Sequence, residues 1–276
     1  MGSKLKTALL WVAAVIITLA SAFYQRRTGP TYHLRGDVTV NGSVYEYDLP
    51  RSHGGDCDAP VTILIPDRAV TGQLSLRRFK SNDEWTAATM ERRGDTLIGA
   101  LPHQPPAGKI MYTIALASPG REAVAVTSEP VVLRFKGDVP LFILIPHVIF
   151  MFIAMLLSTR TGLEALARRP NVVVMTMWTL GLLCLGGMIL GPIVQKYAFG
   201  SFWTGWPYGY DLTDNKTLIA FLAWLGAALL ARYRRSVFLG PIIAAIVLLA
   251  VYVIPHSVRG SELDYTKPTQ STRVGP

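Results

Sequence analysis

The chain has 276 residues, of which 50% are hydrophobic and only 16% are charged, and its formal net charge at pH 7 is +9. The hydrophobic residues are gathered in long runs, so the composition excludes an ordinary soluble globular protein and predicts a polytopic membrane protein. The basic excess accompanies no basic motif interleaved with aromatic residues, and we therefore expect no nucleic-acid partner.

Five apolar runs are candidates for membrane spans. They cover about residues 7–24, 139–157, 171–194, 217–231 and 237–254. A helix needs about 20 residues, with a usual range of about 17–25, to cross the hydrocarbon core of a lipid bilayer. The second, third and fifth runs fit this range. The fourth run is short, and we expect Lys216 and Arg232 to extend it by reaching toward the two interfaces.

The first run is typical of either a membrane anchor or a secretory signal. MGSKLK precedes the run, and Ala20, Ser21 and Ala22 have the small side chains of a cleavage site. The apolar part is nevertheless long enough to cross a bilayer, and Phe23 and Tyr24 follow it as interfacial aromatic residues do. We predict an uncleaved anchor over residues 1–24, with cleavage as the alternative.

Residues 25–138 have a different character. Short alternating runs such as VTVNGSVYEYDLP, PVTILIP and KIMYTIALA are separated by Gly, Pro, Asn and Asp. Alternation with a period of two predicts strands, and their regular spacing predicts an all-β sandwich. In size, and in the stretch LPHQPPAGKIMYTIAL, this domain resembles immunoglobulin- and fibronectin-type sandwiches. That resemblance concerns architecture and implies no chemistry.

Lysine and arginine residues predict the orientation in the membrane. They cluster at Lys4 and Lys6, at Arg160, Arg168 and Arg169, and in RYRR at 232–235. Because such residues collect on the cytoplasmic side, these three clusters are predicted to lie inside.

The same pattern divides the chain into four predicted regions of a bacterial inner-membrane protein. The anchor starts inside, and the β-sandwich at 25–138 is extracytoplasmic. Residues 139–258 form a bundle of four transmembrane α-helices with an outer connector at 195–216. A flexible outer tail is predicted at 259–276.

The outer connector is unusually rich in aromatic residues. Its core reads FGSFWTGWPYGYD over residues 199–211. Two Ile-Pro-His tripeptides, which end at His147 and His256, flank it in the sequence and are both predicted on the outer side. Polar and ionisable residues in or beside a span are candidates for a functional site.

These residues resemble a motif of the haem-handling membrane proteins of cytochrome c assembly. That family carries a tryptophan-rich outer loop of the form W-G-x-x-W-x-W-D between two histidines, whereas this chain has Phe199 in the first position and a longer loop. The resemblance covers residues 140–258 and implies a haem cofactor linked to cytochrome assembly or electron transfer. It implies His147 and His256 as the axial metal ligands, because imidazole is a usual ligand of haem iron. The implied haem platform consists of Phe202, Trp203, Trp206, Tyr208 and Tyr210. The implied partners of the haem propionates are Lys216 and Arg259.

A second hypothesis requires no cofactor. Trp and Tyr collect at membrane interfaces, and aromatic loops also form docking surfaces. The chain is then a non-catalytic accessory or scaffold subunit, whose loop and sandwich bind a partner membrane protein or complex.

The depth of His147 in the membrane bears on the choice between the two hypotheses. If the second span starts at Val139, His147 lies about 12 Å below the outer edge of that span. A helix that begins at Pro146 would raise His147 toward the surface. The sequence leaves open whether the protein is an enzyme.

Two local features complete the predicted bundle. Thr213 or Asp214 is predicted as the N-cap of the fourth span, since both residue types accept hydrogen bonds from a first helical turn. Gly187 and Gly191 have the spacing that lets another helix approach closely.

Overall fold

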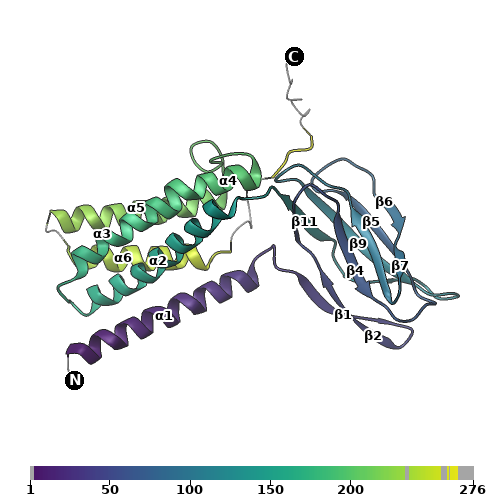
Figure 1. The fold of residues 1–276 in the computed structure, drawn as a ribbon, viewed down its shortest axis with the longest axis horizontal. Helices are drawn as coiled ribbons and strands as arrows, with labels where there is room; N and C mark the ends of the chain where they lie inside the picture. Colours follow the sequence, from purple (N-terminus) through teal and green to yellow (C-terminus); the bar gives the residue numbers. More distant parts are fainter. Residues whose placement is uncertain (1–2, 234–235, 256–259, 261, 267–276) are drawn as a thin grey trace, which may run out of the picture. The chain divides into compact units, whose positions relative to one another are not determined.

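The computed structural model describes residues 3–233, 236–255, 260 and 262–266. The chain divides into two compact units (Figure 1). One unit comprises Met1–Pro30 and Val139–Ser261 and is helical, whereas the other comprises Thr31–Asp138 and Glu262–Pro276 and contains the strands. Each unit is therefore assembled from two separate stretches of the sequence.

The helical unit contains six α-helices and one π-helix among the residues described. They are α1 (Ser3–Thr28), α2 (Leu141–Leu166), α3 (Val172–Leu183), the π-helix η1 (Cys184–Leu190), α4 (Gly191–Phe199), α5 (Leu212–Arg232) and α6 (Leu239–Val253). α3, η1 and α4 follow one another without a break and form one apolar helix, Val172–Phe199. This long helix, α1, α2 and α5 are long and apolar enough to cross a membrane, which confirms four of the five predicted runs at that level.

The fifth run forms a shorter helix than predicted. α6 is apolar but has only 15 residues, and it ends at Val253 before Ile254 turns to an extended conformation. A helix of 15 residues is about 22 Å long, which is less than the hydrocarbon thickness of about 30 Å. α6 packs against α5 and α2, so it belongs to the bundle whatever its length.

Small residues allow the helices of the bundle to pack closely. The bundle core surrounds the fully buried Trp224 of α5, together with Ala154 and Met155 of α2 and Ala244 of α6. A Cβ atom on Gly162 would lie 2.7 Å from the Cβ of Ala245, so only glycine permits that crossing.

α1 extends beyond the predicted anchor and has one buried face. The helix continues to Thr28, four residues past the predicted boundary at 24. Ala14, Thr18 and Ser21 are buried and lie on one face by the i, i+4, i+7 rule. This face packs on α2 and α6, and Gln25 Nε2 donates to Tyr252 O at 2.8 Å.

The β unit contains three sheets around one apolar core. Its strands are β1 (Leu34–Val40), β2 (Ser43–Leu49), β3 (Ser52–Gly54), β4 (Ala59–Leu64), β5 (Thr71–Arg78), β6 (Thr86–Thr89), β7 (Glu91–Arg93), β8 (Thr96–Leu101), β9 (Lys109–Ala117), β10 (Val124–Ala125) and β11 (Val131–Lys136). β1 pairs with β2, the largest sheet has the order β3-β11-β9-β5-β6 with β10 beside β9, and the third has the order β4-β8-β7.

The alternating sequence runs give this unit its core. In β4 the burial alternates strictly, so that Ala59, Val61 and Ile63 face inward. Asn41 and Gly42, both at positive φ, join β1 to β2 as a two-residue hairpin turn requires. A β region after the first helix is thereby confirmed, while its assignment to the immunoglobulin type stays a prediction.

The described part of the predicted tail lies on the β unit. Residues 262–266 belong to this unit, and Leu263 N donates to Ala107 O at 3.2 Å. The sequence predicted a flexible tail from 259 onward, because nothing in its composition indicates the partners that hold these five residues.

Candidate functional site

The connector between α4 and α5 is closed at each end by a specific backbone feature. α4 ends where Gly200 adopts a left-handed conformation with φ of 84°. α5 begins after Asp211, whose carboxylate Oδ1 accepts from Thr213 N at 2.7 Å and Asp214 N at 3.3 Å. The N-cap is therefore Asp211, and the prediction of Thr213 or Asp214 was wrong by two or three residues. The reason is that Asp214 binds a different part of the connector.

The carboxylate of Asp214 holds the first half of the connector. Its Oδ2 accepts hydrogen bonds from Thr204 N at 2.6 Å, Gly205 N at 2.9 Å and Gln195 Nε2 at 3.0 Å. A Cβ on Gly205 would lie 2.6 Å from the Cβ of Asp214, so only glycine lets the backbone come this near. Because Asp214 is buried, its bonds to backbone N–H groups fix the connector firmly.

Further hydrogen bonds hold the second half. Asn215 Oδ1 accepts from Trp206 N at 2.7 Å, and Trp203 Nε1 donates to Trp206 O at 3.0 Å. Gly209 N donates to Gly205 O at 2.9 Å, and a Cβ on Gly209 would lie 2.5 Å from Thr204 O. The glycines and short polar residues among the rings thus form the framework of a compact connector.

Most of the rings carried by this framework are exposed. Trp203 is half-buried, whereas Phe202 is 57%, Trp206 68%, Tyr208 83% and Tyr210 94% exposed. The Lys196 ammonium lies 5.6 Å from the centroid of the Phe202 ring. We call the exposed rings of Phe202, Trp206, Tyr208 and Tyr210 the aromatic surface. Large rings on a fixed backbone present much apolar area at little entropic cost.

His147 lies in α2 opposite the π-helix. α2 begins at Leu141 and continues through Pro146, so the helix does not restart at Pro146, and His147 lies about 9 Å along the helix from its first residue. His147 Nδ1 is 2.9 Å from Gly186 O, which also accepts the backbone N–H of Gly191 in the π-helical pattern. Since a carbonyl only accepts, Nδ1 carries the proton, and Nε2 is the nitrogen that could ligate a metal.

Gly186 and Gly187 of η1 and Gly191 at the start of α4 approach two different helices. Gly186 and Gly191 face α2, and a Cβ on Gly186 would lie 3.1 Å from Met151 Sδ. Gly187 faces α5, where the same test gives 2.9 Å to Thr217 Cγ2. The predicted pair Gly187 and Gly191 therefore does not admit one neighbouring helix, because the two glycines approach different helices.

Lys216 points into the bundle. It is 5% exposed, and its ammonium donates to Ile254 O at 2.6 Å, at the C-terminal end of α6 where a cation is favourable. Lys216 also lines a cavity of about 30 Å³ together with Met151, Thr217 and Tyr252. This space has room for one or two water molecules.

The other predicted members of the site lie outside the described residues. These are His256, the second predicted ligand, and Arg259, the second predicted propionate partner. Whether His147 and His256 meet is therefore a prediction that no observation tests. Among residues 3–233, 236–255, 260 and 262–266, no three His, Cys, Asp or Glu side chains are gathered as metal ligands.

A buried charge cluster at the other end of α2 has no counterpart in the predictions. Arg160 is 2% and Glu164 0% exposed, and Arg160 Nη1 lies 2.6 Å from Glu164 Oε2. Arg169 approaches the same carboxylate at 3.5 Å and donates to Thr7 Oγ1 of α1 at 2.7 Å. The prediction from the sequence used these arginines only as signals of membrane orientation. The i, i+4 spacing of Arg160 and Glu164 nevertheless indicates an ion pair.

Comparison with known proteins adds no relative: no family model matches the chain, and no curated protein sequence is significantly similar to it.

Proposed function

We propose that this protein is a non-catalytic accessory subunit of a membrane complex, and that its aromatic surface docks a partner membrane protein. The observation that carries the proposal is the combination of four rings exposed by 57–94% with a backbone held by Asp214 and Asn215. Tyr and Trp are the residues that dominate binding energy at protein interfaces. A surface that is already fixed loses little entropy when a partner binds.

The proposed orientation places this surface outside a bacterial inner membrane. α1 leads into the β unit, α2 leaves it, and the chain returns to it after α6, because residues 262–266 are held by β-unit groups. If the β unit lies on one side of the membrane, α2, the helix Val172–Phe199 and α5 cross in turn, and α6 has to cross back. Its length of about 22 Å requires the bilayer to thin or flanking residues to extend the span.

The positions of the basic residues indicate which side of the membrane the β unit faces in this proposal. Lys4, Lys6, Arg168 and Arg232 lie at helix ends that this path puts on the side away from the β unit, which supports a cytoplasmic position for those ends, whereas Arg26 and Arg27 at the end of α1 do not follow the rule. The β unit, which we propose is a sandwich of immunoglobulin type, and the connector between α4 and α5 then face the periplasm.

Site-specific photo-crosslinking in whole cells tests the docking. A photoreactive phenylalanine analogue replaces Tyr208 and, as the matched control, Tyr233, which is 71% exposed beyond the other end of α5. We expect one discrete protein adduct from position 208 that position 233 does not give. The double substitution Trp206→Ala and Tyr210→Ala should reduce it at least tenfold. Adducts with lipid alone, or the same products from both positions, would refute the docking role and leave the rings as interfacial anchors.

Haem handling is the second proposal, and one observation favours it. Haem-ligating and metal-ligating histidines commonly donate their other ring N–H to a backbone carbonyl, as His147 does to Gly186 O. The rings of the implied platform fit less well, because the four rings of the aromatic surface point to solvent. A Soret band in the purified protein, lost in His147→Ala and His256→Ala, would establish this function instead.

A further inference from the structure

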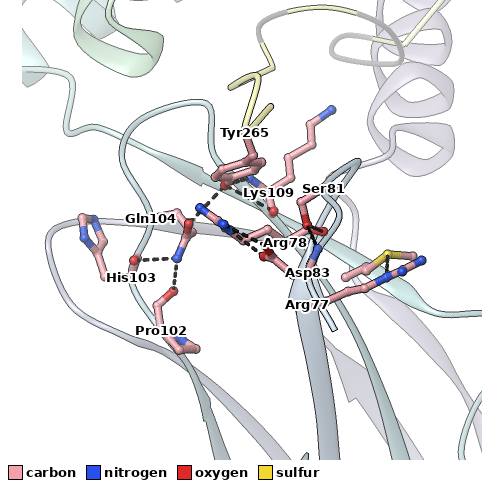
Figure 2. Close-up of polar contacts among 10 residues, drawn as sticks. Arg77, Arg78, Ser81, Asp83, Pro102, His103, Gln104, Lys109 and Tyr265 are labelled. Carbon is pink, nitrogen blue, oxygen red and sulfur yellow. Dashed lines mark hydrogen bonds and ion pairs between the residues drawn. The ribbon is translucent and has the colours of Figure 1, made fainter. Parts of the chain in front are cut away.

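A cationic face of the β unit surrounds the described part of the C-terminal segment. It combines Arg78 at the end of β5, Lys80 in the following turn, Gln104 in the loop before β9, and Lys109 at the start of β9. We call these four residues the tail site (Figure 2 shows Arg78, Gln104 and Lys109 around Tyr265).

The carboxylate of Glu262 binds two cations of this site. Its Oε1 lies 2.6 Å from Lys109 Nζ and its Oε2 lies 2.7 Å from Lys80 Nζ. Lys109 is 8% exposed, and its register partner on β11 is Arg134, which is 5% exposed. Two buried cations side by side repel each other, so a carboxylate from outside the strands stabilises the arrangement.

Tyr265 makes the second set of contacts. Its ring lies under the Arg78 guanidinium, with 4.8 Å between Arg78 Cζ and the ring centroid. The hydroxyl accepts from Lys109 N at 3.0 Å and donates to Gln104 Oε1 at 3.2 Å (Figure 2). The two hydrogen bonds of the hydroxyl distinguish tyrosine from phenylalanine at this position, whereas either ring would make the cation–π contact.

The charges of the tail site support recognition of an acidic group. Burial alone would raise the pKa of Glu262, but hydrogen bonds from Lys109 and Lys80 outweigh it and hold that pKa below its ordinary value. Burial, aided by Arg134, lowers the pKa of Lys109 despite its bond to Glu262. The pKa values of both partners are lowered, although an ion pair alone would raise that of the lysine. The reason is that Lys109 is the more buried partner and bears the larger cost of desolvation.

The segment itself is bound shallowly. Only one backbone hydrogen bond, from Leu263 N to Ala107 O, is described between it and the strand unit, and Leu263 is 37% exposed. Recognition therefore depends on two side chains, Glu262 and Tyr265, rather than on burial of apolar area. A contact of this kind is weak by itself and stays occupied because the chain tethers it.

We propose that the tail site is a peptide-recognition site for a segment of the form Glu-x-x-Tyr, and that Glu262–Tyr265 is a resident ligand which such a segment of a partner protein displaces. The charge complementarity and the seated segment define the ligand: a carboxylate, two intervening residues and a phenol. This site is independent of the docking proposed for the aromatic surface.

Binding of a labelled peptide tests the proposal. The probe is fluorescent Gly-Ser-Glu-Leu-Asp-Tyr-Thr, and the proteins are the full chain and a chain that ends at residue 261, both in detergent. We expect the shortened chain to bind the probe with about tenfold higher apparent affinity. This factor follows from an effective tail concentration of about 1 mM and a Kd of about 0.1 mM. Lys109→Met in the shortened chain, or Gln for Glu in the peptide, should weaken binding at least tenfold.

A second protein keeps the test decisive if the shortened chain does not fold. A protease site is inserted after residue 261 of the full chain, so that folding precedes cleavage. We expect the released tail to exchange with the labelled probe. If the cleaved, folded protein retains its tail against excess probe, or if neither protein binds it, the segment is a permanent structural part and the proposal is wrong.

Light scattering distinguishes two sources of the peptide. A dimer of the full chain that the probe dissociates would show that the displacing segment comes from a second copy, contrary to the proposal. A monomer that binds the probe assigns the segment to another protein.

Discussion

Two carboxylates organise the two units of this protein in opposite ways. Asp214 accepts mainly from backbone N–H groups nine and ten residues away in the chain, whereas Glu262 accepts from lysine side chains 153 and 182 residues away. Bonds to backbone N–H groups fix local geometry and respond little to salt. Ion pairs with lysines select a charge and weaken as ionic strength rises. The first arrangement presents a surface, and the second holds a ligand.

The largest expected effect comes from removing the first carboxylate. Asp214→Ala leaves the N–H groups of Thr204 and Gly205 without their acceptor and should lower the free energy of unfolding of the helical unit by about 3 kcal/mol. Thermal unfolding in detergent measures the loss, and hydrogen exchange should accelerate at Thr204 and Gly205. Asp214→Asn, which keeps one acceptor, should lose about half as much. An unchanged exchange rate in Asp214→Ala would show that the connector does not depend on this group.

The lysines of the tail site should differ from each other. Lys109→Met should weaken tail docking by about 2 kcal/mol, because the Lys109 side chain is 10% exposed and its bond to Glu262 is shielded from water. The control Lys80→Met should cost less than about 1 kcal/mol, because the Lys80 side chain is 66% exposed. Hydrogen exchange at the Leu263 amide reports both. Equal effects would contradict the distinction by burial.

Acid should release the tail from the tail site. The pKa of Glu262 is depressed from its ordinary 4.5, so its contribution to docking is complete above that value and is lost as pH falls through the depressed pKa. The cations that contact Glu262 are Lys80 and Lys109. Hydrogen bonds from Arg78 lower the pKa of Asp83 to about 2, so that pair persists. Anisotropy of the labelled peptide on the shortened chain, measured from pH 7 to 3, should fall, whereas the Gln peptide should show no such step.

The smallest expected effect concerns the second half of the connector. Asn215→Ala removes the acceptor of Trp206 N at an exposed position, where water replaces it, and should lower the free energy of unfolding by about 0.5–1 kcal/mol. Trp206 fluorescence, compared with that of Asn215→Asp, measures the change. A loss as large as that of Asp214→Ala would show that both halves of the connector depend on one network.

The elements were more predictable than the contacts that join them. Long apolar runs predicted the long apolar helices, and alternation predicted a β region, because both patterns arise from local geometry. The N-cap of α5 was misassigned because Asp211, Thr213 and Asp214 are all suitable residues, and only the folded connector decides that Asp214 binds Thr204 and Gly205.

Long-range contacts explain the remaining differences. Arg160 was interpreted as an orientation signal, since a sequence does not show that it turns inward to Glu164 and to the ring of Trp11. The seating of Glu262 on Lys109 joins residues 153 positions apart, and no local pattern encodes it. The pairing of His147 with His256 remains a prediction.

The distance between Lys109 and Glu262 along the chain also has a consequence for biosynthesis. The β unit receives its last acidic residue 153 positions after the lysine that binds it, which corresponds to roughly 8–30 s of translation. During that interval the strands emerge from the ribosome while Lys109 still lacks this counter-ion. In the nascent chain the tail site can therefore bind an acidic group of another molecule. Once Glu262 has been synthesised, it competes for the same lysines.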